Sequence, residues 1–183
     1  EEKFIEIQGE ISSKEKTIIY RDSPCFLDPR NTLLGARVLS SLEKLHLTVK
    51  KLNLKIIEKS NYLKLAHAQG IPIQGVKKLQ DKLFGLESNF EELNGVDFKK
   101  GCYVGQENTA RMKLKNKLRR RLLPIISNTT LKVSDEIKFK ESVIGKVLIE
   151  GVYSFALIKL FDPEFKEFSK QNLKINEFNV QIL

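Results

Sequence analysis

The sequence predicts an α+β protein in two parts that differ in the spacing of their apolar residues. Residues 1–116 mix strand-like alternation with helix-like spacing, whereas residues 117–183 consist of short alternating segments separated by polar turns. The second pattern is typical of a small antiparallel β-barrel. Because 183 residues suffice for two modest hydrophobic cores, we expect an α+β domain over residues 1–116 and a C-terminal β-barrel domain over residues 117–183.

The composition is that of an ordinary globular protein with an excess of positive charge. Hydrophobic residues make up 41% of the chain, charged residues 30%, and the formal net charge is +9, which favours anionic partners without naming one. No apolar stretch approaches the roughly 20 residues that a membrane-spanning helix needs. The two cysteines, Cys25 and Cys102, offer neither a disulfide scaffold nor metal-ligand spacing, so we expect a reducing cytosolic or organellar interior.

The first part is expected to begin with strands and to continue with helices. Strand-like runs occupy residues 3–8, 17–21, 26–27 and 35–39. Asp28, Pro29 and Arg30 follow the third run and fit either a simple turn or a structural corner, since proline presets φ and aspartate bonds nearby backbone. The spacing over residues 42–57 is ambiguous, and we favour a helix that breaks near Asn53.

A second helix is expected after residue 59. Ser60 or Asn61 is placed to cap it, and Gly70 is placed to end it. The residues expected to pack inward are Leu63, Ala66 and Ala68. His67 lies on this helix, and a lone histidine is more often a surface or internally satisfied residue than a ligand.

The remaining elements are short. Helical segments are expected at residues 77–84, 106–114 and 162–170. Strands are expected at residues 117–126, 136–139, 143–150 and 154–160, with one or two more over 173–183.

The most distinctive stretch surrounds Cys102, between Gly101 and Gly105 and just after Lys99 and Lys100. A thiol reacts as the thiolate, which nearby cations and a following helix N-terminus favour. Glycines on both sides allow close backbone approach and positive φ. Two interpretations remain open at this point, a reactive thiol and a buried structural cysteine that packs as a small hydrophobe.

The same stretch resembles a known family. The run from Lys100 to Glu107, Lys-Gly-Cys-Tyr-Val-Gly-Gln-Glu, is similar to the signature of the YgfZ family of folate-binding proteins, which are related to the glycine-cleavage T-protein. Four further segments resemble segments of that family: Asn94-Gly-Val-Asp-Phe, Asp28-Pro-Arg with Leu34-Gly-x-Arg, Gly70-Ile-Pro, and Glu87 with Asn89. The resemblance implies a T-protein-like fold, with a partial folate-binding domain that lacks about the first hundred residues of the family, followed by a barrel.

The resemblance also implies a function. It favours a non-enzymatic, tetrahydrofolate-binding accessory protein that supports assembly or repair of iron–sulfur proteins, and through them tRNA modification. The alternative is a folate-dependent aminomethyltransferase-like one-carbon transferase. The implied location is the cytoplasm, or the mitochondrial matrix in a eukaryote, and the implied partners are folate and iron–sulfur client or assembly proteins.

By the same resemblance Cys102 is the functional thiol. The residues expected to bind the folate are Glu87, Asn89, Lys100, Gly101, Tyr103, Gly105, Gln106, Glu107 and Arg111. Glu87 is suited to accept hydrogen bonds from a pterin ring, and its alternative interpretation is an ordinary solvated glutamate. One cysteine cannot hold a cluster alone, so contact with an iron–sulfur cluster would be transient, shared with a partner, or protective.

The densest basic run spans residues 111–121. A solvated helix face explains it most simply, and a phosphate-contacting patch is the alternative. Direct nucleic-acid binding is therefore a second, less favoured partner class, because the run lacks the interleaved aromatic residues of a single-strand binder.

Overall fold

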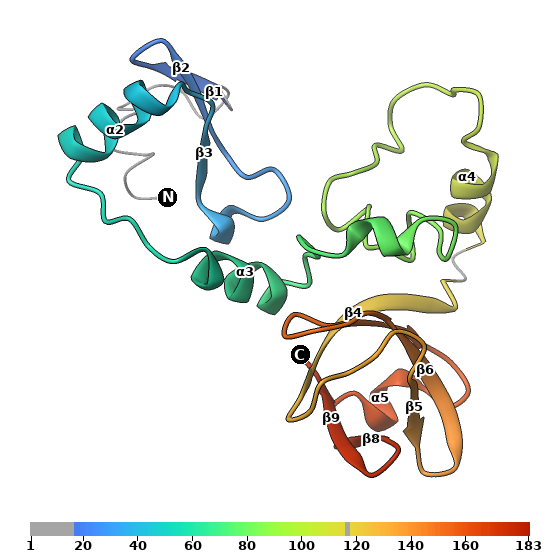
Figure 1. Cartoon of the computed structure of the whole chain (residues 1–183). Helices are drawn as coiled ribbons and strands as arrows, with labels where there is room; N and C mark the ends of the chain where they lie inside the picture. The colour runs from blue at the N-terminus through green and yellow to red at the C-terminus, as the bar shows by residue number, and fades with distance from the viewer. Residues whose placement is uncertain (1–16, 116–117) are drawn as a thin grey trace. The chain divides into compact units, whose positions relative to one another are not determined.

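A computed structural model describes residues 17–115 and 118–183, which divide into two compact units with the boundary between Tyr62 and Leu63 (Figure 1). The strand expected at residues 3–8 and the domain joint expected at 116/117 lie outside the described residues. None of the helices in the described residues is long and apolar enough to cross a membrane.

The first unit contains a three-stranded antiparallel sheet. Its strands are β1 (Thr17–Tyr20), β2 (Ser23–Leu27) and β3 (Ala36–Val38), paired in the order β1-β2-β3. Arg21 and Asp22 connect the first two with φ of 52° and 57°, the left-handed values of a tight hairpin turn. Ile18 and Cys25 are buried side by side under Leu27 and Val38. The three predicted strands in the described part of this unit are thereby confirmed.

One α-helix follows the sheet. A short 3-10 turn, η1 (Thr32–Leu34), precedes β3, and α2 (Leu42–Lys51) follows it. Ser41 caps α2 by accepting a hydrogen bond from the Lys44 N–H, and the helix ends before Asn53, whose φ is 50°. The predicted break near Asn53 is confirmed.

The helix α3 (Lys59–Ala68) differs from prediction at both its start and its buried face. It begins at Lys59, so Ser60 and Asn61 lie inside the helix and the predicted cap is wrong. Ala68 is exposed, and His67 is buried together with Leu63 and Ala66. The spacing i, i+3, i+4 places these three side chains on one face, which turns Ala68 outward.

The second unit ends in a closed six-stranded antiparallel barrel, with strands in the order β4-β7-β6-β5-β8-β9. Their bounds are β4 (Arg120–Ser127), β5 (Glu136–Phe139), β6 (Ser142–Ile149), β7 (Phe155–Lys159), β8 (Leu173–Ile175) and β9 (Phe178–Ile182). The strand β4 closes the barrel by pairing with β7 in its first half and β9 in its second. A short helix, α5 (Phe165–Phe168), contributes the fully buried Phe168 to the barrel core. The predicted barrel is confirmed.

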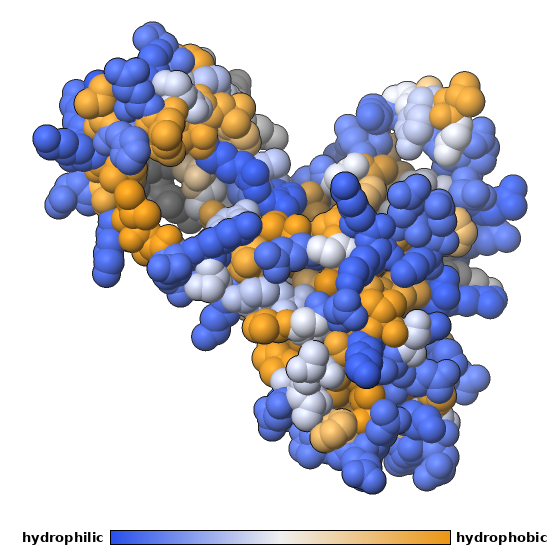
Figure 2. Space-filling model, viewed as in Figure 1, coloured by the Kyte–Doolittle hydropathy of each residue, from blue (hydrophilic) through white to orange (hydrophobic). Residues whose placement is uncertain are grey.

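Residues before the barrel cover part of its outer surface. The 3-10 turn η2 (Val76–Leu79) is shorter than the helix predicted over 77–84, because Asp81 has a positive φ of 59° and interrupts the chain there. Leu79 packs with Leu122, Leu148 and the other outward-facing apolar residues of the barrel wall. Near the chain's middle, α4 (Glu107–Leu114) confirms the helix predicted over 106–114. On the face of this unit visible in Figure 2, apolar areas are bordered by hydrophilic side chains.

Candidate functional site

The loop that carries Cys102 lies on the protein surface. Every residue from Gly101 to Gly105 is exposed, and Val104 retains 97% of its accessible surface. The buried-cysteine interpretation is therefore wrong for Cys102. Cys25 is the buried cysteine of this chain, and burial raises the pKa of its thiol.

Backbone conformation explains one of the two glycines beside Cys102. Gly105 has a φ of 91°, which a glycine adopts without steric cost, whereas Gly101 has no positive φ. Apart from the adjoining residues, no described atom lies within 4 Å of a Cβ placed on either glycine, so both positions are open, and the close approach expected there stays a prediction. The role of Gly105 is to turn the chain into α4.

Cationic and aromatic groups flank the thiol. The Nζ of Lys100 lies 5.7 Å from the centre of the Tyr103 ring, a cation–π contact on an exposed loop. The Lys99 N–H donates to Asp97 Oδ1 at 2.8 Å, which closes the turn that leads into the loop. After the loop, α4 begins at Glu107 without a side-chain cap on its first turn. Backbone N–H groups at such an uncapped start stay available to an acceptor.

Glu87 is a buried carboxylate held by an arginine. Its side chain is 5% exposed and pairs with Arg120, which donates from Nε to Oε1 at 2.9 Å and from Nη2 to Oε2 at 3.3 Å. The Phe84 N–H donates a third hydrogen bond to Oε2 at 3.0 Å. The solvated-glutamate interpretation is therefore wrong. A carboxylate has about four acceptor positions, so one on Oε1 remains for a further donor.

A cleft of about 860 Å³ opens beside this pair. Its lining residues are Phe84, Glu87, Met112, Arg119, Arg120, Lys159, Phe161 and Asp162. Phe84 and Phe161 are about half exposed, at 52% and 57%, and so offer ring faces to a ligand. The cleft thus combines aromatic surface, one buried carboxylate and three cationic side chains.

Asn89 lies in a different environment from Glu87. Its Nδ2 donates to the Leu122 carbonyl at 2.8 Å, and its buried Oδ1 accepts no hydrogen bond from any described residue. It lines a smaller cavity of about 260 Å³ together with Gly70 and Arg121. Glu87 and Asn89 therefore line two different cavities, and one ligand in either cavity would not contact both side chains.

The other predicted site residues follow the loop and the helix. Lys100, Gly101, Tyr103 and Gly105 lie on the exposed loop, Gln106 is half-buried, and Glu107 and Arg111 are exposed on α4. That helix also supplies Met112 to the cleft beside Glu87.

Of the residues that line the cleft, sequence reasoning assigned only Glu87 to a site. Among those it missed, Lys159 and Phe161 come from the end of β7 and the turn after it. The one sequence signal for these two residues is their spacing, since a basic and an aromatic residue two positions apart at a strand end point to the same side of the sheet. Arg119 and Arg120 belong to the basic run, but the sequence did not show that one of them holds Glu87.

The Asp28 corner in the first unit is a closed ion cluster. The Asp28 side chain is 1% exposed and accepts hydrogen bonds from Arg30 and Arg37, at 2.8 Å and 2.7 Å to Oδ2. Both arginines also donate to the Tyr62 hydroxyl, at 3.3 Å and 3.2 Å. The Arg30 hydrogen bond holds the pKa of Asp28 well below its usual value of 3.8. These contacts confirm a structural corner.

Comparison with known proteins shows which proteins this chain is similar to. The chain matches no protein-family model. It is 39% identical over 102 residues to the mitochondrial IBA57 homolog of Dictyostelium discoideum, an iron–sulfur cluster assembly factor, covering 55% of this chain and 25% of that protein. The homolog of Pyricularia oryzae is 32% identical over 125 residues, covering 68% and 31%. The human protein is 37% identical over 99 residues, covering 54% and 27%.

The homologues of this chain are IBA57 iron–sulfur cluster assembly factors. The matched segments cover about a quarter to a third of their length. These relatives are named as mitochondrial proteins. Within residues 17–115 and 118–183, no three or more His, Cys, Asp or Glu side chains are grouped so as to hold a metal ion.

Proposed function

We propose that this chain acts in iron–sulfur cluster assembly in the mitochondrial matrix, with Cys102 as the functional thiol. The observation that carries the proposal is the exposure of Cys102 on a loop flanked by Lys100 and Tyr103. An exposed thiol is open to a second protein, which a buried one is not. The similarity to assembly factors named IBA57 supports a role in iron–sulfur cluster assembly.

In this proposal the cluster is cargo, and the chain contributes one ligand to it. A [2Fe–2S] or [4Fe–4S] cluster normally needs four protein ligands. Cys102 supplies one thiolate after losing its proton, so a partner protein supplies the others during transfer. Effects on tRNA modification then follow indirectly, through enzymes that need such clusters.

We further propose that the cleft beside Glu87 binds tetrahydrofolate. Phe84 and Phe161 provide ring faces for a flat heterocycle, and the open acceptor position on Glu87 Oε1 suits a ring N–H. Arg119 and Lys159 suit the carboxylates of the ligand's glutamate. Bound folate would supply a one-carbon carrier beside α4, and this chain's residues would bind and orient it.

Substitution of the two cysteines tests the role of the thiol. In cells that lack their own assembly factor, we expect Cys102→Ala to abolish restoration of a [4Fe–4S] enzyme activity while leaving the melting temperature unchanged, since Cys102 packs against no core. Cys25→Ala, the matched control, should lower the melting temperature and keep activity wherever the protein still folds. Full restoration by Cys102→Ala would refute the thiol role.

Calorimetric titration with tetrahydrofolate tests the cleft. Lys159→Gln should weaken binding by at least about tenfold, since removing a charge-assisted hydrogen bond costs about 1.5–3 kcal/mol. Lys138→Gln, an exposed lysine on β5 outside the cleft, is the control. Equal affinities of the two variants would remove the cleft from the proposal, and turnover of an aminomethyl donor would favour the one-carbon transferase instead.

A further inference from the structure

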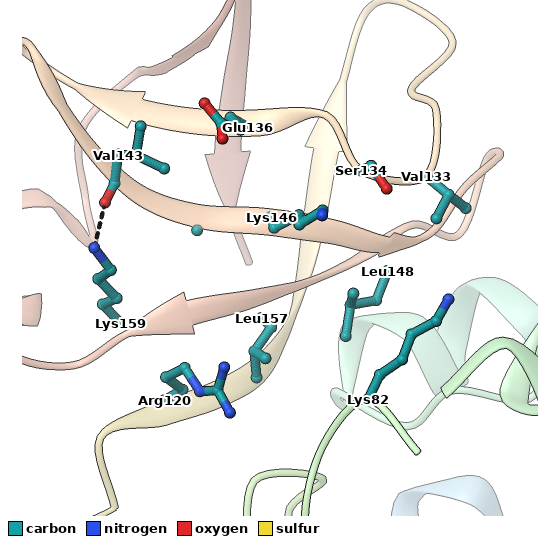
Figure 3. Close-up of a pocket in the computed structure, with 11 residues that line it drawn as sticks. Lys82, Arg120, Val133, Ser134, Glu136, Val143, Lys146, Leu148, Leu157 and Lys159 are labelled. Carbon is teal, nitrogen blue, oxygen red and sulfur yellow. Dashed lines mark hydrogen bonds between the residues drawn. The ribbon is translucent and has the colours of Figure 1, made fainter. Parts of the chain in front are cut away.

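A second groove crosses the outer wall of the barrel. Its volume is about 470 Å³, and strands β4, β5, β6 and β7 contribute to it together with the segment after η2. The apolar residues that line it are Val133, Val143, Leu148 and Leu157. The charged residues are Lys82, Arg120, Glu136, Lys146 and Lys159. Figure 3 shows Leu148 and Leu157 between Lys146 on one side and Lys82 and Arg120 on the other.

Strand register creates this arrangement. Lys146 on β6 pairs with Leu157 on β7, and the same lysine pairs with Glu136 on β5. On the next strand, Arg120 pairs with Lys159. Four strands therefore bring three cations to one wall, and the turn after η2 adds Lys82. The leucines between them belong to the apolar cluster that η2 covers in part.

Two of these cations have no partner of their own in the described part of the chain. Arg120 is bound to Glu87, and Lys159 donates to the Val143 carbonyl at 2.9 Å (Figure 3). Lys82 and Lys146 are exposed, and their side chains form no hydrogen bond or ion pair with any described residue. Even with Arg120 neutralised by Glu87, three lysines face the single carboxylate of Glu136 among the described lining residues, so the groove is positively charged.

We propose that this groove binds a short acidic segment of a partner protein. Carboxylates of that segment would meet Lys82 and Lys146, and an apolar side chain between them would lie on Leu148 and Leu157. Charge complementarity selects the occupant, since the groove and the whole chain, at +9, are both cationic. The described residues that line the groove include no aromatic ring on which a nucleic-acid base could stack, and the aliphatic floor favours a peptide. This groove includes no residue of the Cys102 loop, and it shares Arg120 and Lys159 with the cleft beside Glu87.

Paired charge reversals in the whole chain provide the test. The probe is a labelled peptide in which glutamates flank two leucines, and its affinity is measured by fluorescence polarisation. We expect Lys82→Glu with Lys146→Glu to weaken binding at least about tenfold, in the range measured for close charge pairs across interfaces. Lys138→Glu with Lys174→Glu makes the same change in net charge on exposed positions of β5 and β8 and should leave affinity within about twofold.

Variant peptides separate the groove from a general attraction to anions. Replacing the leucines with serines, or the glutamates with glutamines, should each weaken binding to the unmodified chain. Equal loss in the two lysine pairs, or unchanged binding of the serine peptide, would overturn the proposal. The proposal would also be overturned if tRNA displaced the peptide and the salt dependence of tRNA binding were the same in both double lysine variants. That result would point to a nucleic-acid surface. Melting curves of both pairs confirm that each variant is folded.

Discussion

Among the residues that the structure describes, each unit holds one cysteine and one buried carboxylate bound by arginine, yet the two units use them differently. In the first unit, Cys25 is 2% exposed and Asp28 is enclosed by Arg30 and Arg37. In the second, Cys102 is exposed and Glu87 lines a large cleft. The same pairs of residue types thus serve packing in one region and surface chemistry in the other. Position, not residue type, decides which groups are available to ligands and partners.

The two thiols should differ most in their rates of alkylation. We expect Cys102 to react with iodoacetamide at neutral pH at least about a hundredfold faster than Cys25, since a buried group reacts only after a local opening that costs a few kcal/mol. Mass spectrometry of the two cysteine-containing peptides over time measures both rates. Similar alkylation rates would contradict the contrast between a buried Cys25 and an exposed Cys102, because they would mean that the first unit opens freely.

Removal of each buried carboxylate should destabilise the chain to a different extent. Asp28→Asn is expected to lower the free energy of unfolding by about 2–4 kcal/mol, because it leaves two guanidinium groups without their charge partner. Glu87→Gln is expected to cost less, about 1–2 kcal/mol, since the Arg120 side chain is 44% exposed and water can solvate it.

Urea unfolding monitored by circular dichroism gives both values. Asp22→Asn is the control, because Asp22 is 90% exposed and its pair with Lys44 spans 3.4 Å, so its effect should stay below about 0.5 kcal/mol. A loss for Glu87→Gln larger than that for Asp28→Asn would reverse the proposed assignment of structural and ligand-binding carboxylates.

Acidification should lower the stability of the chain in two separate steps, one from His67 in the second unit and one from Asp28 in the first. Burial lowers the pKa of His67 below 6.5, so the unfolded chain binds more protons and stability falls as pH drops through about 6.5. The lowered pKa of Asp28 acts later, because its stabilisation is present above pH 3.8 and is lost as pH falls below that value. Urea midpoints measured across this range should show both declines.

A glutamine at position 67 isolates the first decline. His67→Gln keeps an N–H that can reach the Ser154 carbonyl, to which His67 Nε2 lies at 2.9 Å, but it does not titrate. The variant should therefore lose the decline near neutral pH and retain the one in acid. An unchanged profile would assign the near-neutral step to another group.

Local patterns predicted most of the secondary structure and few of the long-range contacts. The barrel strands were predictable because alternation along each strand reflects which side faces the core, as in the pattern of Phe155 to Lys159. The start of α3 was not predictable in the same way. Ser60 and Asn61 are good helix caps in isolation, but the helix already begins at Lys59, before both of them. His67 was expected to be satisfied or on the surface. Its burial depends on a carbonyl 87 residues away.

The candidate site divides in the same way. The motif around Cys102 was visible in the sequence, and its exposure agrees with a reactive thiol, while the roles given to Asn89, Tyr103, Gln106 and Arg111 stay predictions. The Glu87–Arg120 pair joins residues 33 positions apart, and no local pattern encodes such a partner. Lys159 and Phe161 reach the cleft only because β7 pairs with β4.

The sequence by itself determined the order of the elements, the barrel and the motif that carries Cys102, because periodicity and turn residues act over a few neighbouring positions. Tertiary structure alone decided which cysteine is buried, which carboxylate borders a cleft and which lysines share the groove on the barrel wall. Those properties arise where distant segments pack together, and water is excluded or admitted only after that packing is complete.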